Sequence, residues 1–295
     1  MEISVVIPVY NQSTPLKLTL EGYCNQTINR NIFEIIVVDD GSDDPLELDE
    51  WKERLQIKVI RQQNLGRAIA RNTGIESSDG ELIIFNDADR IPCSEFIEIH
   101  LASHKKNGNC VVIGNPKELY ISNLECRVNE ILSYIKSGKI TRFARKYLYS
   151  TVISHLFKEE GGTDSVIPWM GFFSGNSSVR RDDLRSAGMF NPKFKEWGFE
   201  HFELGYRLFH AGHPFRFAAN GVNYHLAHQR NTSFYKEHFK YSASLFSEIQ
   251  QDVRILKIYN FLVGELSLQG LEELFGGHSN TINSSEDIYF SSFNG

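Results

Sequence analysis

The sequence predicts an α/β protein, with a Rossmann-like, mostly parallel sheet, helices on both faces of that sheet, and a helical C-terminal tail. Two observations lead to this prediction. Short β-branched runs alternate with segments of helical periodicity through the first third of the chain, and such alternation produces parallel strands joined by right-handed crossovers. Polar residues follow three of the runs, at the strand ends where α/β sheets bind their ligands.

The expected strands and helices follow from the spacing of apolar residues. Runs rich in Ile, Val and Phe predict buried strands at 3–9, 33–38, 57–60 and 81–85. Helical spacing predicts helices over 14–23, 48–55, 67–76 and 197–211, and a largely helical tail from 231 to about 275. A loop leads into a strand within 167–179, and another strand is expected within 215–225.

Composition and charge exclude several classes of protein. The 295 residues carry 31 Lys and Arg against 37 Asp and Glu, a net charge of −6, so we expect no nucleic-acid partner, which would need a basic face. The four cysteines form no C-x-x-C pair, which argues against a cysteine-based zinc site or a disulfide scaffold. No signal-peptide pattern and no membrane-spanning apolar run is visible. We therefore expect a cytoplasmic protein, with peripheral contact at the inner face of the membrane left open.

A pair of aspartates follows the fourth expected strand, in the sequence Asp87-Ala88-Asp89. Two carboxylates at this spacing can converge on one hard divalent cation, which then bridges to phosphates. The same pattern is also typical of an ordinary turn. By itself it does not decide between a metal site and a turn.

Two further segments suit a nucleotide ligand. Asp39-Asp40-Gly41-Ser42 follows the second strand, where a carboxylate can accept the imide N–H of a uracil ring and glycine permits close approach to the backbone. Arg67 and Arg71 lie four residues apart on an expected helix, so their guanidiniums share a face that suits a diphosphate. A turn and a solvated basic helix face are the alternatives for these two segments.

A later helix start combines two carboxylates with a histidine, in Glu200-His201-Phe202-Glu203. Glu200 and Glu203 can reach one side of the helix, and His201 lies between them in sequence. Histidine is a common general base near neutral pH. These residues are therefore candidates for acid–base chemistry.

Together these motifs resemble those of one enzyme family. Family 2 glycosyltransferases with a GT-A fold carry similar motifs, in the same order and at the same spacing as four segments of this chain: 4–11, 37–42, 64–72 and 86–89. Segments 175–179 and 197–208 resemble bacterial chondroitin-polymerase-type catalytic domains and the C-terminal motif of galactosyltransferases. The resemblance covers roughly residues 1 to 230.

The resemblance implies a UDP-sugar donor and a divalent metal, Mn²⁺ or Mg²⁺, that neutralises the leaving UDP. The donor-binding residues that it implies are Pro8, Tyr10, Asp39, Asp40, Gly66, Arg67, Arg71, Asp87 and Ala88. The implied acceptor-binding residues are Asn176, Trp197, Gly198 and Glu203. The implied metal ligands are Asp87, Asp89 and a late histidine, with His225 ranked ahead of His228.

One departure from the family pattern concerns the catalytic base. Similar inverting enzymes have Glu-Asp where this chain has Glu200-His201, and in them that Asp deprotonates the acceptor hydroxyl. His201 and Glu200 are therefore the expected catalytic residues. Glu203 as the base, and loss of the base, are the alternatives.

The expected function is metal-dependent transfer of a hexose or N-acetylhexosamine from a UDP-sugar to a saccharide, lipid-linked or protein acceptor, with inversion. The alternative is a catalytically weak, nucleotide-sugar-binding partner subunit of a glycosyltransferase complex. A nicotinamide-dependent oxidoreductase is disfavoured, because no G-x-G-x-x-G follows the first strand.

The expected organisation is a GT-A catalytic domain over 1–230 and a helical extension over 231–295, which is a candidate surface for homo-oligomer formation. Within the domain, 1–115 form the nucleotide-sugar-binding half, 116–165 a helical insertion, and 166–230 the acceptor and catalytic half. The insertion contains a basic stretch over 136–146 with interleaved apolar residues. This stretch predicts a solvated helix face, a lid, or contact with an anionic acceptor or a membrane surface.

Overall fold

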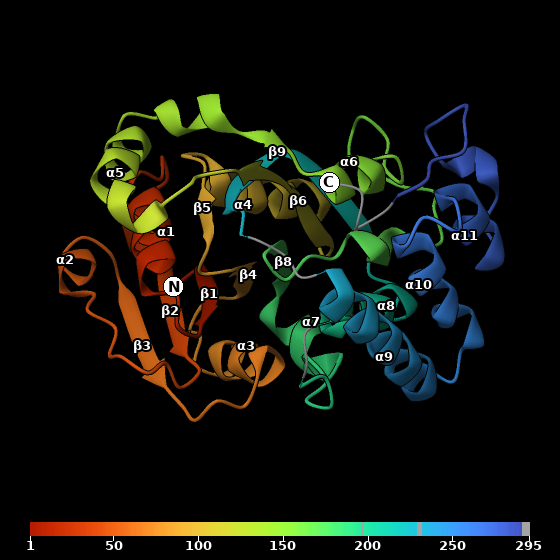
Figure 1. The fold of residues 1–295 in the computed structure, drawn as a ribbon, viewed down its shortest axis with the longest axis horizontal. Coiled ribbons are helices and arrows are strands. Elements are labelled where there is room, and N and C mark those ends of the chain that lie inside the picture. Colours follow the sequence, from red (N-terminus) through yellow and green to blue (C-terminus); the bar gives the residue numbers. More distant parts are fainter. Residues whose placement is uncertain (196–197, 229–231, 291–295) are drawn as a thin grey trace.

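A computed structural model describes residues 1–195, 198–228 and 232–290 of the chain. Within these ranges lie the strands β1 (Ile3–Val9), β2 (Phe33–Asp39), β3 (Ile57–Arg61), β4 (Leu82–Asn86), β5 (Arg90–Pro92), β6 (Val111–Leu119), β7 (Arg145–Lys146), β8 (Asn176–Arg180) and β9 (Phe215–Leu226). They form one sheet in the order β3-β2-β1-β4-β8-β6-β9-β5, with β7 paired to β6 (Figure 1).

The α-helices of the described ranges are α1 (Ser13–Cys24), α2 (Asp49–Lys52), α3 (Arg67–Glu76), α4 (Phe96–Asn107), α5 (Val128–Lys136), α6 (Leu148–Ser154), α7 (Arg181–Ser186), α8 (Glu200–His210), α9 (Thr232–Gln250), α10 (Lys257–Leu262) and α11 (Leu268–Leu274). The helical tail that the sequence predicts corresponds to α9–α11. None of the described helices combines the length and the apolar character needed to cross a membrane.

The first four strands are parallel, as predicted. β1 lies between β2 and β4 and pairs with both, with Val9 opposite Asp39 and Val6 opposite Phe85. β3 extends the sheet from β2. The carboxyl ends of these strands therefore meet at one edge, where the polar residues that follow β1, β2 and β4 lie close together.

The rest of the sheet is mixed, because the alternation of strand and helix does not continue beyond about residue 90. β8 runs antiparallel to β4 and β6, whereas β6 and β9 are parallel to each other. β5 runs antiparallel to β9, with Arg90 opposite His225. This last pairing places the loop after β4 beside the end of β9.

Helices cover the sheet on both faces. One buried apolar cluster packs α1 against one face, with Leu16 and Leu20 against Ile35. A larger cluster on the other face includes Ile36 and extends to Phe246 and Phe261 of the tail helices. Residues that alternate along β2 thus belong to different clusters, as the pleat of a strand requires. The tail helices lie at the end of the molecule opposite β3 (Figure 1).

The basic stretch over 136–146 is not the continuous helix that the sequence suggested. α5 ends at Lys136, and Gly138 has a φ of +68°, the left-handed conformation that commonly terminates a helix. A 3-10 helix over Lys139–Phe143 follows, and then Arg145 and Lys146 form β7 against β6. This pairing holds the end of the basic stretch at the sheet.

Candidate active site

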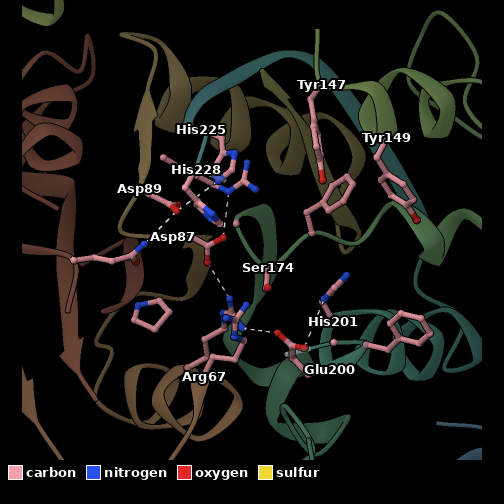
Figure 2. Close-up of a pocket in the computed structure, with 18 of the residues that line it drawn as sticks. Arg67, Asp87, Asp89, Tyr147, Tyr149, Ser174, Glu200, His201, His225 and His228 are labelled. Carbon is pink, nitrogen blue, oxygen red and sulfur yellow. Dashed lines mark hydrogen bonds and ion pairs between the residues drawn. The ribbon is translucent and has the colours of Figure 1, made fainter. Parts of the chain in front are cut away.

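A large pocket lies at the carboxyl ends of the first strands and extends to the start of α8. Its volume is about 880 Å³. Figure 2 shows Asp87, Asp89, His225 and His228 on one side of this pocket, and Tyr147, Tyr149 and His201 on the other. One wall is therefore charged and the other is largely aromatic.

The loops after β1 and β2 build one end of the pocket. The predicted donor-binding residues that border it here are Pro8, Tyr10, Asp40 and Gly66. The carboxylate of Asp40 accepts hydrogen bonds from the backbone N–H groups of Leu65 (3.0 Å) and Gly66 (2.9 Å). Gly66 has a φ of +91°, which glycine adopts without strain. Asp40 therefore fixes the shape of this loop as well as bordering the pocket.

Asp39 and Ala88 lie behind the pocket wall and do not border the cavity. Asp39 accepts the backbone N–H of Ser42 at 2.9 Å and lies 3.4 Å from the guanidinium of Arg61. Ala88 is buried, and its carbonyl accepts the hydroxyl of Thr19 at 2.8 Å. Both residues support the wall of the pocket in this structure, and their contact with a donor stays a prediction.

The two predicted arginines of α3 have different surroundings. Arg67 is exposed and borders the pocket. Arg71 is 2% exposed, and it donates from Nη2 to Asp87 (2.9 Å) and from Nη1 to Glu200 (3.1 Å). Arg71 is therefore committed to two carboxylates, which leaves Arg67 as the arginine of α3 better placed to reach a diphosphate.

Asp87 is held between two arginines. Arg71 donates to one of its oxygens, and Nε of Arg90 donates to the other at 3.1 Å. Burial alone would raise the pKa of Asp87, but the charges of these arginines lower it well below its usual value. Gly175 makes room for the pair, because a Cβ at that position would overlap both Asp87 and Arg90.

Asp89, His225 and His228 form a group suited to a metal ion. Each offers one ligand atom, and these atoms all lie within 4.8 Å of one another. Nδ1 of His225 lies 3.0 Å from a carboxylate oxygen of Glu118, a second carboxylate that orients the imidazole as is usual for metal ligands. The donor set fits Mn²⁺ better than Mg²⁺, because imidazole is a poor ligand for Mg²⁺.

The electrostatics of this group also suit a cation. Burial and Arg90 would lower the pKa of His225, but its interactions with Asp89 and Glu118 raise it overall. The pKa of Asp89 is lowered by His225, against the effect of burial. A bound cation would replace the proton that these carboxylates favour on the imidazole. Asp87, the expected third ligand, lies outside this group, with its oxygens on Arg71 and Arg90, whereas His228 lies within it.

Glu200 and His201 lie across the pocket, at the start of α8. Oε1 of Glu200 accepts from Arg71, whereas Oε2 has no hydrogen-bond partner among the described residues and lies 3.9 Å from Nδ1 of His201. Burial would raise the pKa of Glu200, but His201, Arg67 and Arg71 lower it to about 2. His201 borders the pocket and stacks on Phe173, with ring centroids 6.4 Å apart. A carboxylate of such low basicity is a weak general base, so His201 is the better candidate.

The predicted acceptor-binding residues do not come together. Gly198 borders the pocket, whereas Asn176 and Glu203 are fully buried and do not. Glu203 forms an ion pair of 2.7 Å with Arg207 of its own helix, so it belongs to the packed face of α8, and Asn176 bonds within the sheet. Trp197 lies outside the described residues. Asn176 and Glu203 thus lie in the protein interior in this structure, and their contact with an acceptor stays a prediction.

An aromatic wall of the pocket was not predicted from the sequence. It is lined by Tyr147, Tyr149, Phe173, Phe202, Phe239 and Phe290. The ring of Tyr149 lies 5.2 Å from that of Phe173 and 5.1 Å from that of Phe290. Gln12, Arg90 and Glu118 around the metal group were missed as well. These residues come from separate segments, so no local pattern marks them.

The fold and this pocket define a glycosyltransferase. The model of the family described as glycosyl transferase family 2 matches residues 4–160, and the chain belongs to this family. A second model, described as the N-terminal domain of galactosyltransferase, matches residues 154–229.

Curated relatives agree with this assignment. The uncharacterized glycosyltransferase YfnE of Bacillus subtilis is 28% identical over 78% of this chain and 66% of its own length. Chondroitin synthase of Escherichia coli is 29% identical over 76% of this chain and 34% of its own length. Validoxylamine A glucosyltransferase of Streptomyces hygroscopicus subsp. jinggangensis is 29% identical over 77% of this chain and 56% of its own length. The chain thus spans between 34% and 66% of the length of these relatives.

Solved structures confirm the GT-A fold. S. aureus TarS 1–349 in complex with UDP superposes with a TM-score of 0.63 at 18% identity, over 88% of this chain and 71% of that one. The TarS complex with UDP-GlcNAc superposes with a TM-score of 0.61 at 16% identity, over 88% of this chain and 72% of that one.

Proposed function

We propose that this glycosyltransferase transfers a hexose or N-acetylhexosamine from a UDP-sugar to an acceptor hydroxyl, with a divalent cation as its cofactor. The observation that carries the proposal is the group of Asp89, His225 and His228 at the edge of a pocket that Tyr10 and Arg67 also border. A cation and a guanidinium suit a diphosphate, and the exposed aromatic ring of Tyr10 can stack on a nucleobase. The UDP complexes of TarS, which shares the fold, support this choice of donor.

The charged wall would hold the diphosphate of the donor. Asp89, His225 and His228 would hold the cation, and Arg67 would contact a phosphate. When bound, the cation would neutralise the negative charge that develops on the leaving diphosphate. Asp87 stays ionised between Arg71 and Arg90, so it would not act as a proton donor in this wall.

His201 is the general base in this proposal. The acceptor oxygen attacks the anomeric carbon, the bond from that carbon to the diphosphate oxygen breaks, and the hydroxyl proton passes to His201. Glu200, ionised and 3.9 Å from the imidazole, stabilises the imidazolium that forms. Attack opposite the leaving group inverts the anomeric configuration.

The acceptor would occupy the aromatic wall. In this wall Phe173 stacks on His201, and the ring of Tyr147 lies 6.1 Å from that of Phe173. Aromatic side chains in a pocket bind the apolar faces of a ligand. Lys146 borders the same pocket. A saccharide, free or carried by a lipid or protein, offers both the hydroxyl and the ring faces that this wall suits.

The test is a screen of the common UDP-sugars for UDP release, with Mn²⁺, with Mg²⁺ or with excess chelator. We expect release from at least one donor, at lower concentrations of Mn²⁺ than of Mg²⁺, and none in chelator. Asp89→Ala should abolish turnover while the circular dichroism spectrum stays unchanged. Full activity in chelator would exclude the metal role, and failure of every UDP-sugar would exclude the donor.

A further inference from the structure

Six buried polar side chains form a continuous chain from α4 to the turn after β4. In order, they are His104, Ser178, His100, Asn176, Asn223 and Asn86. Each is at most 5% exposed, and none borders the pocket. They come from α4, β8, β9 and β4, so the chain crosses the centre of the sheet.

Backbone carbonyls fix the orientation of the amides at the pocket end. Nδ2 of Asn86 donates to the carbonyls of Arg90 (2.8 Å) and Asp87 (3.2 Å). Nδ2 of Asn223 donates to the carbonyl of Gly175 (2.6 Å) and to Oδ1 of Asn86 (2.7 Å). A carbonyl can only accept, so the amide group of Asn86 points into the turn that begins with Asp87, and that of Asn223 points toward Gly175 and Asn86.

The same reasoning assigns the protons of the other members. Nδ2 of Asn176 donates to Oδ1 of Asn223 at 2.9 Å and to a backbone carbonyl at 3.1 Å, so its Oδ1 accepts from Nε2 of His100 at 3.1 Å. Nδ1 of His100 then accepts the hydroxyl of Ser178 (2.8 Å), whose oxygen accepts from Nε2 of His104 (2.9 Å). Every donor in the chain points in one direction, toward the pocket.

His100 is neutral in this arrangement, since its Nδ1 accepts and its Nε2 donates. Burial lowers the pKa of His100 to about 3 and that of His104 to about 4, so the neutral forms predominate at neutral pH. Cys110 lies at the far end, with its sulfur 3.8 Å from Nδ1 of His104. The chain is therefore complete without any charged group.

The chain ends on the turn that presents Asp89. Asn86 binds two carbonyls of this turn, and Asn223 holds the carbonyl of Gly175, which packs against Asp87 and Arg90. Asn223 and His225 lie two residues apart on β9, so their side chains leave the same face of the strand. One strand thus supplies a candidate metal ligand and the anchor for the turn that carries another.

We propose that Asn223 is a positioning residue for the metal group, because it holds the turn of residues 86–90 at the distance from His225 at which Asp89 and His225 can share one cation. This inference rests on the proposed metal-dependent function. Asn223 acts through Asn86 and Gly175 and touches neither donor nor cation.

The experiment compares Asn223→Ala and Asn223→Asp with the wild type. Asn223→Asp keeps the size of the side chain and the acceptor for Asn176, but neither of its oxygens, when ionised, can donate to Asn86 or Gly175. Ser165→Ala is the matched control, because Ser165 is also buried and hydrogen-bonded, to Glu272, and does not border the pocket. Ser178→Ala interrupts the chain further from the turn by loss of a single hydroxyl.

Mn²⁺ affinity in saturating UDP is measured by isothermal titration calorimetry, together with the urea midpoint and UDP release at saturating Mn²⁺. We expect both Asn223 variants to bind Mn²⁺ about 10–100-fold more weakly, the range typical of residues that orient metal ligands. Activity should recover toward the wild type as Mn²⁺ is raised. Ser178→Ala should show a smaller loss in the same direction, and Ser165→Ala should bind Mn²⁺ as the wild type does.

Wild-type Mn²⁺ affinity in Asn223→Asp would overturn the inference. If neither Asn223 variant folds, Ser178→Ala decides: an affinity equal to that of Ser165→Ala overturns the inference, and a weaker one supports it. If the wild type binds Mn²⁺ and releases UDP, and all variants have the same Mn²⁺ affinity as the wild type, only the positioning role is refuted. A wild-type protein that does neither refutes the proposed function and the inference that rests on it.

Discussion

Arg71 donates a hydrogen bond of 3.1 Å to Glu200, which lies 129 residues further along the chain. The same guanidinium donates to Asp87 and lies 5.4 Å from the ring centroid of Phe190. One buried arginine therefore joins the charged wall of the pocket to the start of α8, which carries His201. The proposed transfer needs both walls at a fixed separation, and Arg71 connects them directly.

Arg71→Ala should destabilise the protein strongly, because it leaves the buried carboxylate of Glu200 without its arginine and removes one of the two arginines that hold Asp87. Removal of one member of a buried ion pair costs about 3–5 kcal/mol, which urea unfolding would measure. Arg67→Ala is the matched control, one turn earlier on α3 and exposed. It should change stability by less than about 0.5 kcal/mol and weaken UDP binding instead. Equal, small losses of stability in both variants would contradict the structural role of Arg71.

His201→Ala should lower kcat by about 10²–10⁴-fold, the usual contribution of a general base, with little change in the KM for the donor. His201→Asp should keep substantial activity, since it restores a carboxylate base at this position. The measurement is steady-state UDP release with acceptor present. Normal turnover by His201→Ala beside an inactive Glu200→Gln would assign the base to Glu200. A product that retains the anomeric configuration would rule out single displacement.

Removal of the charges of Arg145 and Lys146 should impair use of the acceptor and spare donor binding. β7 holds both residues beside the pocket that Lys146 borders. Exposed charge contacts contribute about 0.2–1 kcal/mol each, so the double change to Gln should raise the acceptor KM by roughly 2–30-fold. Lys105→Gln with Lys106→Gln removes the same charge from the exposed end of α4 and should leave KM unchanged. Loss of UDP binding in the first variant would indicate a structural role for β7.

The free energy of unfolding should fall as the pH is lowered from about 6.5 to 5. Burial lowers the pKa of His100 to about 3 and that of His104 to about 4, whereas unfolded histidine titrates near 6.5. In this window the unfolded chain binds more protons than the folded one, and each buried histidine costs up to about 1.4 kcal/mol per pH unit. The pKa of His225 is raised, so the titration of His225 changes the free energy of unfolding only above this pH window. Urea unfolding at several pH values would measure the slope, which His104→Asn should reduce. A flat profile would contradict the neutral, buried histidines.

The sequence by itself determined the parallel half of the sheet and the position of the pocket. α3 begins at Arg67 and ends at Glu76, as its spacing predicts, and β1, β2 and β4 lie where the apolar runs do. These features depend on residues that are neighbours in the chain, so local patterns suffice. Because the carboxyl ends of parallel strands share an edge, the same patterns predict that Tyr10, Asp40 and Asp87 lie close together, and all three border one pocket.

Only the tertiary structure decided what each polar side chain does there. Asp87 and Asp89 are two residues apart, yet Asp87 faces arginines and Asp89 faces histidines. Arg67 and Arg71 share a helix, yet only Arg71 is buried. The physical reason is that the deciding partners are distant in the chain: His225 on β9 faces Asp89, and Glu200 on α8 binds Arg71. Strand pairing and packing bring these segments together, and such long-range register leaves no periodic signal in the sequence.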